Sequence, residues 1–471
     1  MKTSLCYLLL YFFQFQQNLV SQQVGIHLLQ ESPPSLKIQN CESDGKCSEI
    51  RMSVTLDADI RPLQVLQGME SCITDEEKAW DRRYCADSER CAEQCSLGGV
   101  KYKAVHGITT DDHTLKLRLF THGKLTESRV YLLADQKHYQ LFHLKNQQFS
   151  FEVDASKVPC GVHAALYFTS MKADGGLSRT NKAGAMYGTG YCDSQCPTAL
   201  RFINGRANIE ASGQPREQVF KSMGACCPEL DLWEGNGMVQ AYGAHPCVFP
   251  SMTTCEGEDC TSKGGLCDHS GCGLASQRVD QNTFYGPNKT IDTRHKFTVV
   301  TQFLTSNATT QGELVEIKQF YIQHGVLIKH RGIKLPGQDS SLNSITDAFC
   351  SIMSNTTGTG SAFRRTGGLE AMGRAMEKGL VLVMGLWTDE VTDSLGSIQK
   401  IPATRKNSLK RINQLVCPEE TRTQPFIQKH HPHASVLFSN IKVGPITNFP
   451  YNDLQDYSYQ HQVHANEHTI I

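Results

Sequence analysis

The cysteine content is the feature that most constrains the fold of this chain. There are 19 cysteines, and removing Cys6, which lies in an apolar N-terminal stretch, leaves eighteen. An even number of cysteines in an exported chain predicts a framework of disulfides that hold long loops. Five of the cysteines crowd into residues 247–272. A zinc cluster is the alternative interpretation of that spacing, but an oxidising compartment favours disulfides.

The N-terminus predicts export. An apolar run over residues 5–15 follows a lysine, and a small-residue cleavage site lies near Ser21, as in a secretory signal peptide. We therefore expect a signal peptide over residues 1–21 and a secreted, extracellular mature chain. No later run reaches the roughly 18–20 apolar residues that a membrane helix needs. Sequons predict glycosylated loops at Asn288, Asn307 and Asn355.

The charge balance excludes two classes of partner. With 46 basic and 47 acidic side chains the formal net charge is -1, so neither nucleic acid nor an anionic membrane is an expected partner. No repeat or linker divides the chain, and we expect one domain over residues 22–446 and a polar tail over 447–471. Histidines in that tail and at 430–433 raise the question of a metal, but such a composition is more typical of a solvated surface. The sequence implies no metal and no cofactor.

Alternating apolar and polar residues predict an all-β fold. In KFTVVTQFLT (296–305), Phe297, Val299 and Phe303 share one face, as in a half-buried strand. Further strands are expected at 49–59, 129–135, 164–171, 379–387 and 435–443. Helices are expected only at 89–97, 341–353 and 368–378, packed against a two-sheet sandwich.

Three acids stand close together in ACCPELDLWEG (225–235). If this segment is a strand, Glu229 and Asp231 share one face and Glu234 points to the other. A β-bulge would turn Glu234 back. Three carboxyl groups in one cleft would then keep one protonated beside another that is charged. The alternative is a solvated edge strand that packs through the apolar residues between the acids.

Several stretches, kept in order, resemble glycoside hydrolase family 7. They are GTGYCDSQCPTALRFINGRANIE (188–210), ACCPELDLWEGN (225–236), HPC (245–247), NTFYGP (282–287), FTVVTQF (297–303) and FSNIKVGPI (438–446). The resemblance covers almost the whole mature chain. It implies a β-jelly-roll sandwich of two antiparallel sheets with long disulfide-bonded loops and a few short helices. It also implies cellulose or another β-1,4-glucan as the partner, and we expect a monomer.

The resemblance also implies roles for the three acids. Glu229 corresponds to the nucleophile, Glu234 to the general acid/base, and Asp231 to a carboxylate that orients Glu229 by a hydrogen bond. Two carboxyl groups about 5–5.5 Å apart leave no room for a water between them, so a covalent glycosyl-enzyme forms and configuration is retained. A stacking platform and polar contacts to the sugar are implied at Trp387, Tyr167, Tyr191, Asp193, Gln195, His245 and Arg278.

The disulfide pairing follows from the same resemblance and uses all eighteen cysteines. The implied pairs are Cys41 with Cys47, Cys72 with Cys95, Cys85 with Cys91, Cys160 with Cys417, Cys192 with Cys227, Cys196 with Cys226, Cys247 with Cys267, Cys255 with Cys260, and Cys272 with Cys350.

Departures from the family favour endo action. Ile60, Pro62 and Gly396 stand where cellobiohydrolases of the family carry tryptophans. The loop between Cys260 and Cys267 holds only TSKGGL (261–266), where the cellobiohydrolases have a longer loop. Gln414 stands where they carry an arginine. These losses predict an open cleft and an endo-β-1,4-glucanase. A reducing-end cellobiohydrolase, action on mixed-linkage glucan or xylan, and a glucan-binding protein without catalysis are the alternatives.

Overall fold

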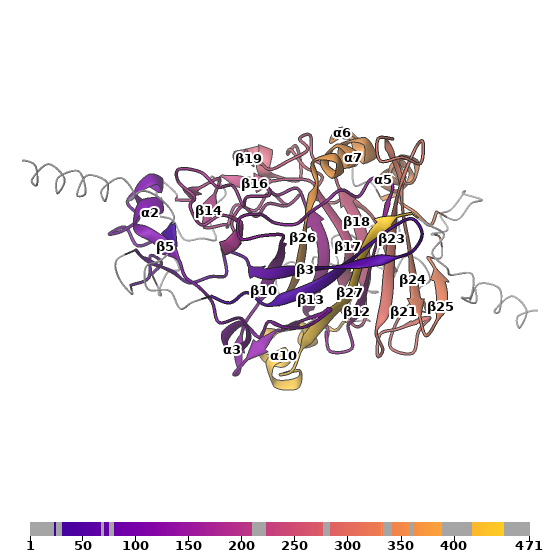
Figure 1. Cartoon of the computed structure of the whole chain (residues 1–471), viewed down its shortest axis with the longest axis horizontal. Helices are drawn as coiled ribbons and strands as arrows, with labels where there is room; N and C mark the ends of the chain where they lie inside the picture. The colour runs from indigo at the N-terminus through magenta and orange to yellow at the C-terminus, as the bar shows by residue number, and fades with distance from the viewer. Residues whose placement is uncertain are drawn as a thin grey trace, which may run out of the picture.

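Strands are the commonest regular elements of the structure, and they run mainly antiparallel (Figure 1). The computed structural model describes residues 23–24, 31–66, 70–74, 80–209, 223–276, 283–330, 332, 342–357, 362–388 and 417–446. The expected signal peptide and the C-terminal tail fall outside these ranges. In the described part of the chain no helix is both long and apolar enough to cross a membrane.

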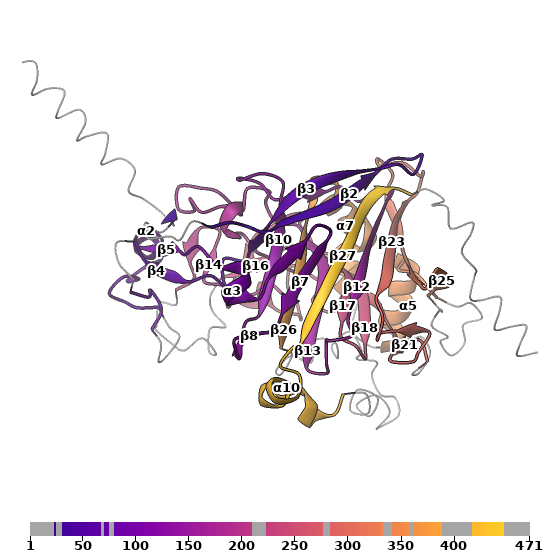
Figure 2. The same ribbon diagram turned by 60° about the horizontal axis from the view of Figure 1, so that its bottom comes forward.

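One hydrogen-bonded sheet of 16 strands carries the architecture. Its main path runs through β20 (Cys272–Ala275), β18 (Gln240–His245), β17 (Glu229–Gly235), β13 (Val162–Thr169), β26 (Leu380–Thr388), β10 (Ser128–Leu133), β3 (Cys47–Leu56), β2 (Ser35–Cys41), β27 (Ser435–Pro445), β12 (Gln147–Asp154), β23 (Phe297–Thr305), β24 (Leu314–Gln323) and β25 (Val326–Lys329). Beside this path, β11 (Leu141–Phe142) pairs with β26, and β6 (Thr109–Asp111) and β7 (Thr114–Arg118) continue from β27. Figure 2 shows β27 running across the molecule; β12 pairs along one of its edges, and β7 and β2 pair one after the other along the opposite edge.

The sheet folds over on itself as a sandwich, and aromatic rings fill the space between its two layers. Phe168 of β13 meets Phe149 of β12 edge-on, with ring centroids 5.1 Å apart. Trp233 of β17 meets Phe438 of β27 in the same way at 6.2 Å. Backbone hydrogen bonds also connect the two layers at one edge, because β2 pairs with β3 on one side and with β27 on the other. The fold is the all-β jelly-roll sandwich that the family resemblance implies.

Alternation along the inner strands creates the floor of the site. On β13, Leu166 and Phe168 belong to the core between the layers. Ala165 and Tyr167 belong to a second buried cluster on the opposite face, together with Tyr131 of β10. Because side chains alternate along a strand, one face of β13 fills the sandwich and the other is free to build a site.

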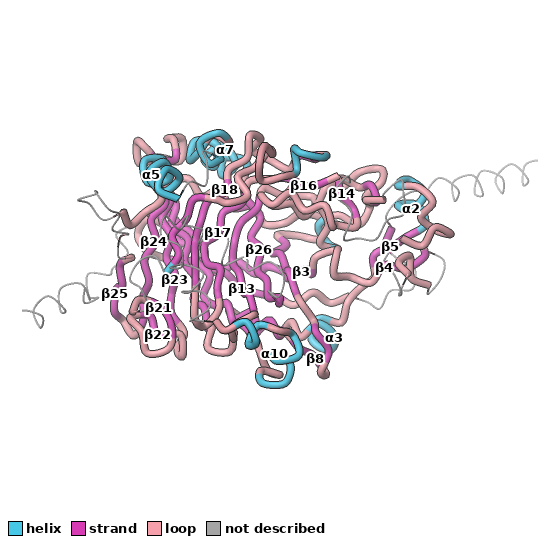
Figure 3. The backbone as a smooth tube through the Cα atoms, turned by 180° about the vertical axis from the view of Figure 1, so that it is seen from behind, coloured by secondary structure: helices cyan, strands magenta, loops and turns pink. Residues whose placement is uncertain are grey.

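Helices and short strands lie around the edges of the sandwich (Figure 3). The helices are α2 (Ser88–Gln94), α3 (Tyr102–His106), α5 (Asp347–Thr357), α6 (Ala362–Arg365), α7 (Gly368–Lys378) and α10 (Gln424–His430), with 3-10 turns η1 (Ala185–Tyr187), η3 (Gly257–Cys260) and η4 (Glu419–Arg422). The short strands are β1 (Gln23–Val24), β4 (Leu63–Val65), β5 (Cys95–Leu97), β8 (Phe120–Thr121), β9 (Lys124–Leu125), β14 (Phe202–Ile203), β15 (Arg206–Ala207), β16 (Gly224–Cys226), β19 (Thr253–Cys255), β21 (Tyr285–Gly286) and β22 (Ile291–Asp292).

Two of the expected helices differ from those observed. The helix expected at 341–353 begins only at Asp347, because Ile345 still exchanges backbone hydrogen bonds with Ile317 of β24. The helix expected at 89–97 ends at Gln94, and residues 95–97 form β5 against β4. The third, at 368–378, has the expected bounds, and its apolar face is buried in the core.

The part of the chain that the structure describes contains nine disulfides, and they connect the same cysteine pairs that the family resemblance implies. The cysteines of residues 247–272 are all among them. A disulfide sulfur offers no thiolate to a metal, so the zinc interpretation of this cluster is wrong. The three sequon asparagines are exposed: Asn288 and Asn307 lie in turns and Asn355 near the end of α5.

Candidate active site

A β-bulge on β17 brings the three acids to one face. Against β18, Asp231 lies opposite Gly243 and Glu234 lies opposite Ala241, so two residues of β17 face one residue of β18. The register against β13 shifts at the same place. One extra residue reverses the facing of every later side chain. Glu229, Asp231 and Glu234 consequently line the same cleft, and the edge-strand alternative is wrong.

The cleft has a volume of about 1210 Å³ and lies on the face of β13, β17 and β26 that points away from the core between the layers. It is lined by every predicted site residue that the structure describes, from five different segments of the chain. These are Glu229, Asp231, Glu234, Trp387, Tyr167, Tyr191, Asp193, Gln195 and His245. Arg278 lies outside the described residues.

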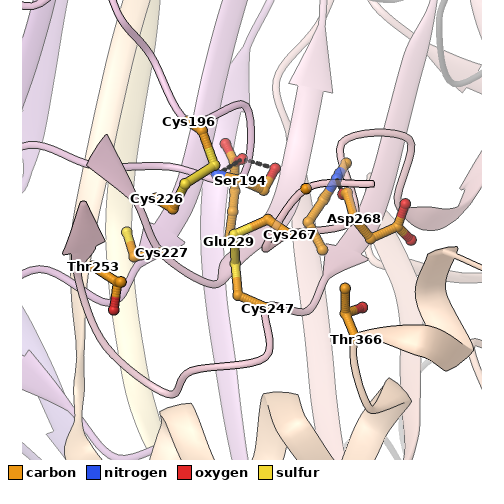
Figure 4. Close-up of a disulfide and its surroundings, with 12 residues drawn as sticks. Ser194, Cys196, Cys226, Cys227, Glu229, Cys247, Thr253, Cys267, Asp268 and Thr366 are labelled. Atoms are coloured by element: carbon orange, nitrogen blue, oxygen red, sulfur yellow. Dashed lines mark hydrogen bonds between the residues drawn. A yellow bond between two sulfur atoms is a disulfide. The ribbon is translucent and has the colours of Figure 1, made fainter. Parts of the chain in front are cut away.

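Glu229 is buried and held by a serine. Its Oε2 accepts hydrogen bonds from Ser194 N at 3.1 Å and from Ser194 Oγ at 2.6 Å. Figure 4 shows this pair beside the Cys196–Cys226 disulfide, two residues from Ser194. Burial, with the charges of Asp231 and Asp193, raises the pKa of Glu229 well above its ordinary value. The serine opposes this shift because hydrogen bonds to a carboxylate favour its charged form.

Asp231 bonds to a histidine and not to Glu229. Its Oδ2 lies 2.9 Å from His245 Nε2, and His245 Nδ1 lies 2.9 Å from the backbone oxygen of Asp268. The expected hydrogen bond from Asp231 to Glu229 is absent among the described residues, and Ser194 holds Glu229 in its place. The reason is geometric: the partner of Asp231 comes from the next strand, β18.

These buried charges shift one another. Burial and then the charge of Glu234 raise the pKa of Asp231 to about 6, although His245 acts in the opposite direction. Burial disfavours a charge on His245, but Asp231 and Glu229 overcome this and raise its pKa well above the ordinary value. His245 is therefore a cation placed among three carboxyl groups.

A chain of hydroxyl groups leads from the cleft floor to Asp193. Tyr167 and Tyr191 share a hydrogen bond of 2.9 Å, and Tyr191 donates to Asp193 Oδ2 at 2.7 Å. Gln195 donates its backbone N–H to Asp193 and its side-chain amide to the backbone oxygen of His269. The chain orders polar groups that can hydrogen-bond a sugar.

Trp387 lies flat on the cleft floor. A Cβ added to Gly385 would lie 2.3 Å from the indole ring, so the ring covers the backbone of β26 at that glycine. Glu127 fixes the adjacent residue, because its Oε1 accepts from Thr388 N at 2.9 Å and from Thr388 Oγ1 at 2.6 Å. A flat, partly buried indole in an open cleft can stack on the apolar face of a sugar ring.

His163 stands between Trp387 and Glu234. It is 1% exposed and lies directly opposite Trp387 across β13 and β26. Its ring centroid is 4.7 Å from that of Trp387, and its Nε2 is 3.3 Å from Glu234 Oε1.

Several of these residues were not found from the sequence. Arg129 stacks on Tyr191, with its guanidinium carbon 3.4 Å from the ring centroid, and it bonds to Asp57 at 3.2 Å. The sequence could have indicated Ser194, because it lies between the predicted site residues Asp193 and Gln195. It could also have indicated His163, because residues 163 and 167 point to the same face of a strand. No neighbouring motif marks Arg129 or Glu127.

The chain matches the model described as Glycosyl hydrolase family 7 over residues 26–449. Among solved structures it is similar to a GH7 family cellobiohydrolase from Daphnia pulex, at 34% sequence identity and a TM-score of 0.81, with 90% of this chain and 100% of that chain covered. It is also similar to the endocellulase EGI of Humicola insolens, at 30% identity and a TM-score of 0.75, with 91% and 100% covered. A cellobiohydrolase from Melanocarpus albomyces complexed with cellotetraose matches at 32% identity and a TM-score of 0.79, with 91% and 100% covered.

Proposed function

The chain belongs to glycosyl hydrolase family 7, and from this premise we propose that it is a retaining endo-β-1,4-glucanase that cleaves internal bonds of cellulose or a related β-glucan. The observation that carries the proposal is the bulge of β17, which turns Glu229, Asp231 and Glu234 into one cleft beside the indole of Trp387. A secreted monomer with one catalytic domain over residues 22–446 is part of the same proposal.

Glu229 is the proposed nucleophile. Ser194 occupies its Oε2, which leaves Oε1 to attack the anomeric carbon. The bond from that carbon to the leaving oxygen breaks as the ester to Glu229 forms, and the leaving oxygen takes the proton of Glu234. Water then attacks the same carbon, gives its proton to Glu234 and releases Glu229. Two inversions at one carbon retain its configuration.

The cation of His245 makes this arrangement of charges workable. Three carboxyl groups in a buried cleft disfavour one another's ionisation. A protonated His245 beside Asp231 offsets part of that repulsion, so Glu229 can carry the charge that a nucleophile needs.

Substrate binding follows from the same cleft. Trp387 offers a stacking surface, while Tyr167, Tyr191, Asp193 and Gln195 offer hydrogen bonds to hydroxyl groups. The tyrosine and tryptophan side chains among the described residues that line the cleft are Tyr167, Tyr191 and Trp387. The hydroxyl groups of the two tyrosines hydrogen-bond to each other, and Tyr191 also donates to Asp193.

Two features favour endo over exo action. Ile60, an aliphatic residue, lines the cleft where a longer chain would pass. Residues 261–266 form a tight turn between the Cys255–Cys260 and Cys247–Cys267 disulfides and contribute nothing to the lining of the cleft. A glucan chain can therefore enter an open cleft at any point. The similar solved structures include cellobiohydrolases and an endocellulase alike, so a reducing-end cellobiohydrolase is the second candidate.

Product analysis tests this proposal. Carboxymethylcellulose, crystalline cellulose, mixed-linkage glucan and xylan are each incubated with the secreted protein, with Glu229→Gln as the matched control. Endo action predicts a fast fall in viscosity and a spread of oligosaccharide lengths at early times. Cellobiose as almost the sole early product from crystalline cellulose would instead identify a cellobiohydrolase. Equal activity of Glu229→Gln, or binding without cleavage by both proteins, would overturn the catalytic assignment.

A further inference from the structure

His163 contacts two functional groups of the cleft at once. Three neighbouring strands bring these residues together: His163 lies directly opposite Trp387 of β26, while Glu234 of β17 pairs with Ala165, two residues along β13. His163 Nε2 is 3.3 Å from Glu234 Oε1, and its ring lies against the indole at 4.7 Å with an interplanar angle of 32°. The imidazole is thereby fixed on one side by packing and on the other by a carboxyl group.

From this geometry we infer that His163 is a positioning residue for the general acid, an inference that rests on the proposed function. An N–H from His163 Nε2 to Glu234 Oε1 leaves the acidic proton on Oε2, the only other oxygen of that carboxyl group. The same contact fixes the rotation of the carboxyl group, so that Oε2 faces the leaving oxygen. The 3.3 Å contact lies within ion-pair distance but is not aligned as a hydrogen bond in this structure. Catalytic hydrogen bonds are often poorly aligned before substrate binds and tighten in the substrate complex.

Burial makes the contact strong enough to matter. His163 is 1% exposed, and the side chain of Glu234 is 15% exposed. Water therefore competes little for either atom, and a hydrogen bond in such a site is stronger than one at the surface. The ionisable groups that line the same cleft include Asp231 and Glu229 of β17, His245 of β18, Arg129 of β10, Glu127 before β10, and Asp193.

Trp387 supports the imidazole on the side away from Glu234. The indole packs both against Gly385 and against the ring of His163. The stacking surface and the residue that contacts the general acid are therefore direct neighbours.

Leaving-group dependence separates this role from a merely structural one. The test compares kcat/KM for phenyl cellobioside, whose leaving group needs a proton, with kcat/KM for 2,4-dinitrophenyl cellobioside, whose leaving group does not. Both substrates place the same disaccharide on Trp387, so a loosened platform lowers both values equally. We expect His163→Ala to lower the phenyl value about 10- to 100-fold, which is a part of the roughly 100- to 10,000-fold that general acid catalysis contributes, and to change the dinitrophenyl value less than about threefold.

Two further variants make the test decisive. His163→Gln keeps an N–H close to the position of Nε2 and should recover most of the phenyl value. His330→Ala removes an equally buried histidine, 3% exposed and packed on Phe284 away from the cleft, and should leave the ratio of the two values unchanged even if the melting temperature falls.

Each result supports or overturns the inference. Equal losses on both substrates, no loss at all, or failure of His163→Gln to restore the ratio would each overturn it. Glu234→Gln should show the same split more strongly. If Glu234→Gln shows no split, or the unmodified protein cleaves neither substrate, the proposed function itself fails, and that outcome is distinct from a failure confined to His163.

Discussion

Ser194 donates two hydrogen bonds to one oxygen of Glu229, from its backbone N–H at 3.1 Å and from its hydroxyl at 2.6 Å. The hydroxyl bond is the one that a mutation can remove. Hydrogen bonds to charged groups contribute about 1.5–3 kcal/mol. Ser194→Ala should therefore lower kcat about 10- to 100-fold and raise the pKa of Glu229.

Steady-state kinetics over a range of pH check this prediction. Ser170 supplies the control: its hydroxyl is buried and donates to the backbone oxygen of Pro250, outside the cleft. Ser170→Ala should change stability with little effect on kcat. An unchanged kcat in Ser194→Ala would show that the backbone N–H alone holds the nucleophile.

The His245 cation predicts a shift in pH dependence. The charge on His245 lowers the pKa of both Glu229 and Asp231. His245→Asn removes that charge, so both carboxylates become less stable and their pKa values rise. Because Glu229 must be ionised to attack, the acid limb of kcat/KM should move to higher pH. A limb that stays in place or moves to lower pH contradicts this account of the site.

Ionised Glu229 should lower the free energy of unfolding at neutral pH. Its pKa is raised in the folded protein, so the folded state holds the proton more tightly than the unfolded chain. The stabilising contribution of protonated Glu229 is present at low pH and is lost as pH rises through the folded pKa. Glu229→Gln should abolish turnover and yet raise the unfolding free energy at pH 7 by about 1.4 kcal/mol for each pKa unit of the shift.

Thermal melts at several pH values measure this effect. The gain in Glu229→Gln should shrink as pH falls toward the ordinary range of a glutamate, where the wild-type side chain is neutral in both states. A gain that does not depend on pH would have to come from packing and not from the buried charge.

An aromatic ring in place of Ile60 should increase the affinity for long glucan chains. Ile60 lines the cleft, and aromatic stacking contributes about 0.5–1.5 kcal/mol beyond area burial. Ile60→Trp in a Glu229→Gln background should lower the Kd for a long cello-oligosaccharide about 2- to 12-fold. Calorimetry with cellobiose is the control, since a short ligand covers less of the cleft than a long oligosaccharide does. A uniform change for both ligands would place Ile60 nearer the centre of the site.

The Cys160–Cys417 disulfide should stabilise the fold more than the Cys41–Cys47 disulfide does. The first spans a sequence separation of 257, whereas the second spans 6. The chain-entropy model assigns about 5.5 kcal/mol to the first and about 2 kcal/mol to the second. Replacing each pair by serines and measuring urea unfolding tests the difference. Equal losses would mean that native contacts around the bridges outweigh loop length.

The sequence by itself determined the strand pattern, the core face of α7 and the identity of the three acids. A strand that is buried on one face has apolar residues at every second position, and this pattern can be recognised without knowing which strands lie beside it. This alternation located β3, β10, β13, β23, β26 and β27 to within a few residues. The helix starts were less certain, since a strand pairing such as that of Ile345 with Ile317 overrides local helical preference.

Only the tertiary structure decided which side chains meet. From the sequence, the three acids could belong to a bulged strand that lines a cleft or to a solvated edge strand. The register of β17 against β18 shows the bulge. The sequence assigned the hydrogen bond on Glu229 to Asp231, whereas the folded chain gives it to Ser194 and pairs Asp231 with His245. His163 and Glu234 are 71 positions apart in the sequence and meet because β13 and β17 are neighbours. Contacts across strands depend on register, and register is set by the packing of the whole sandwich.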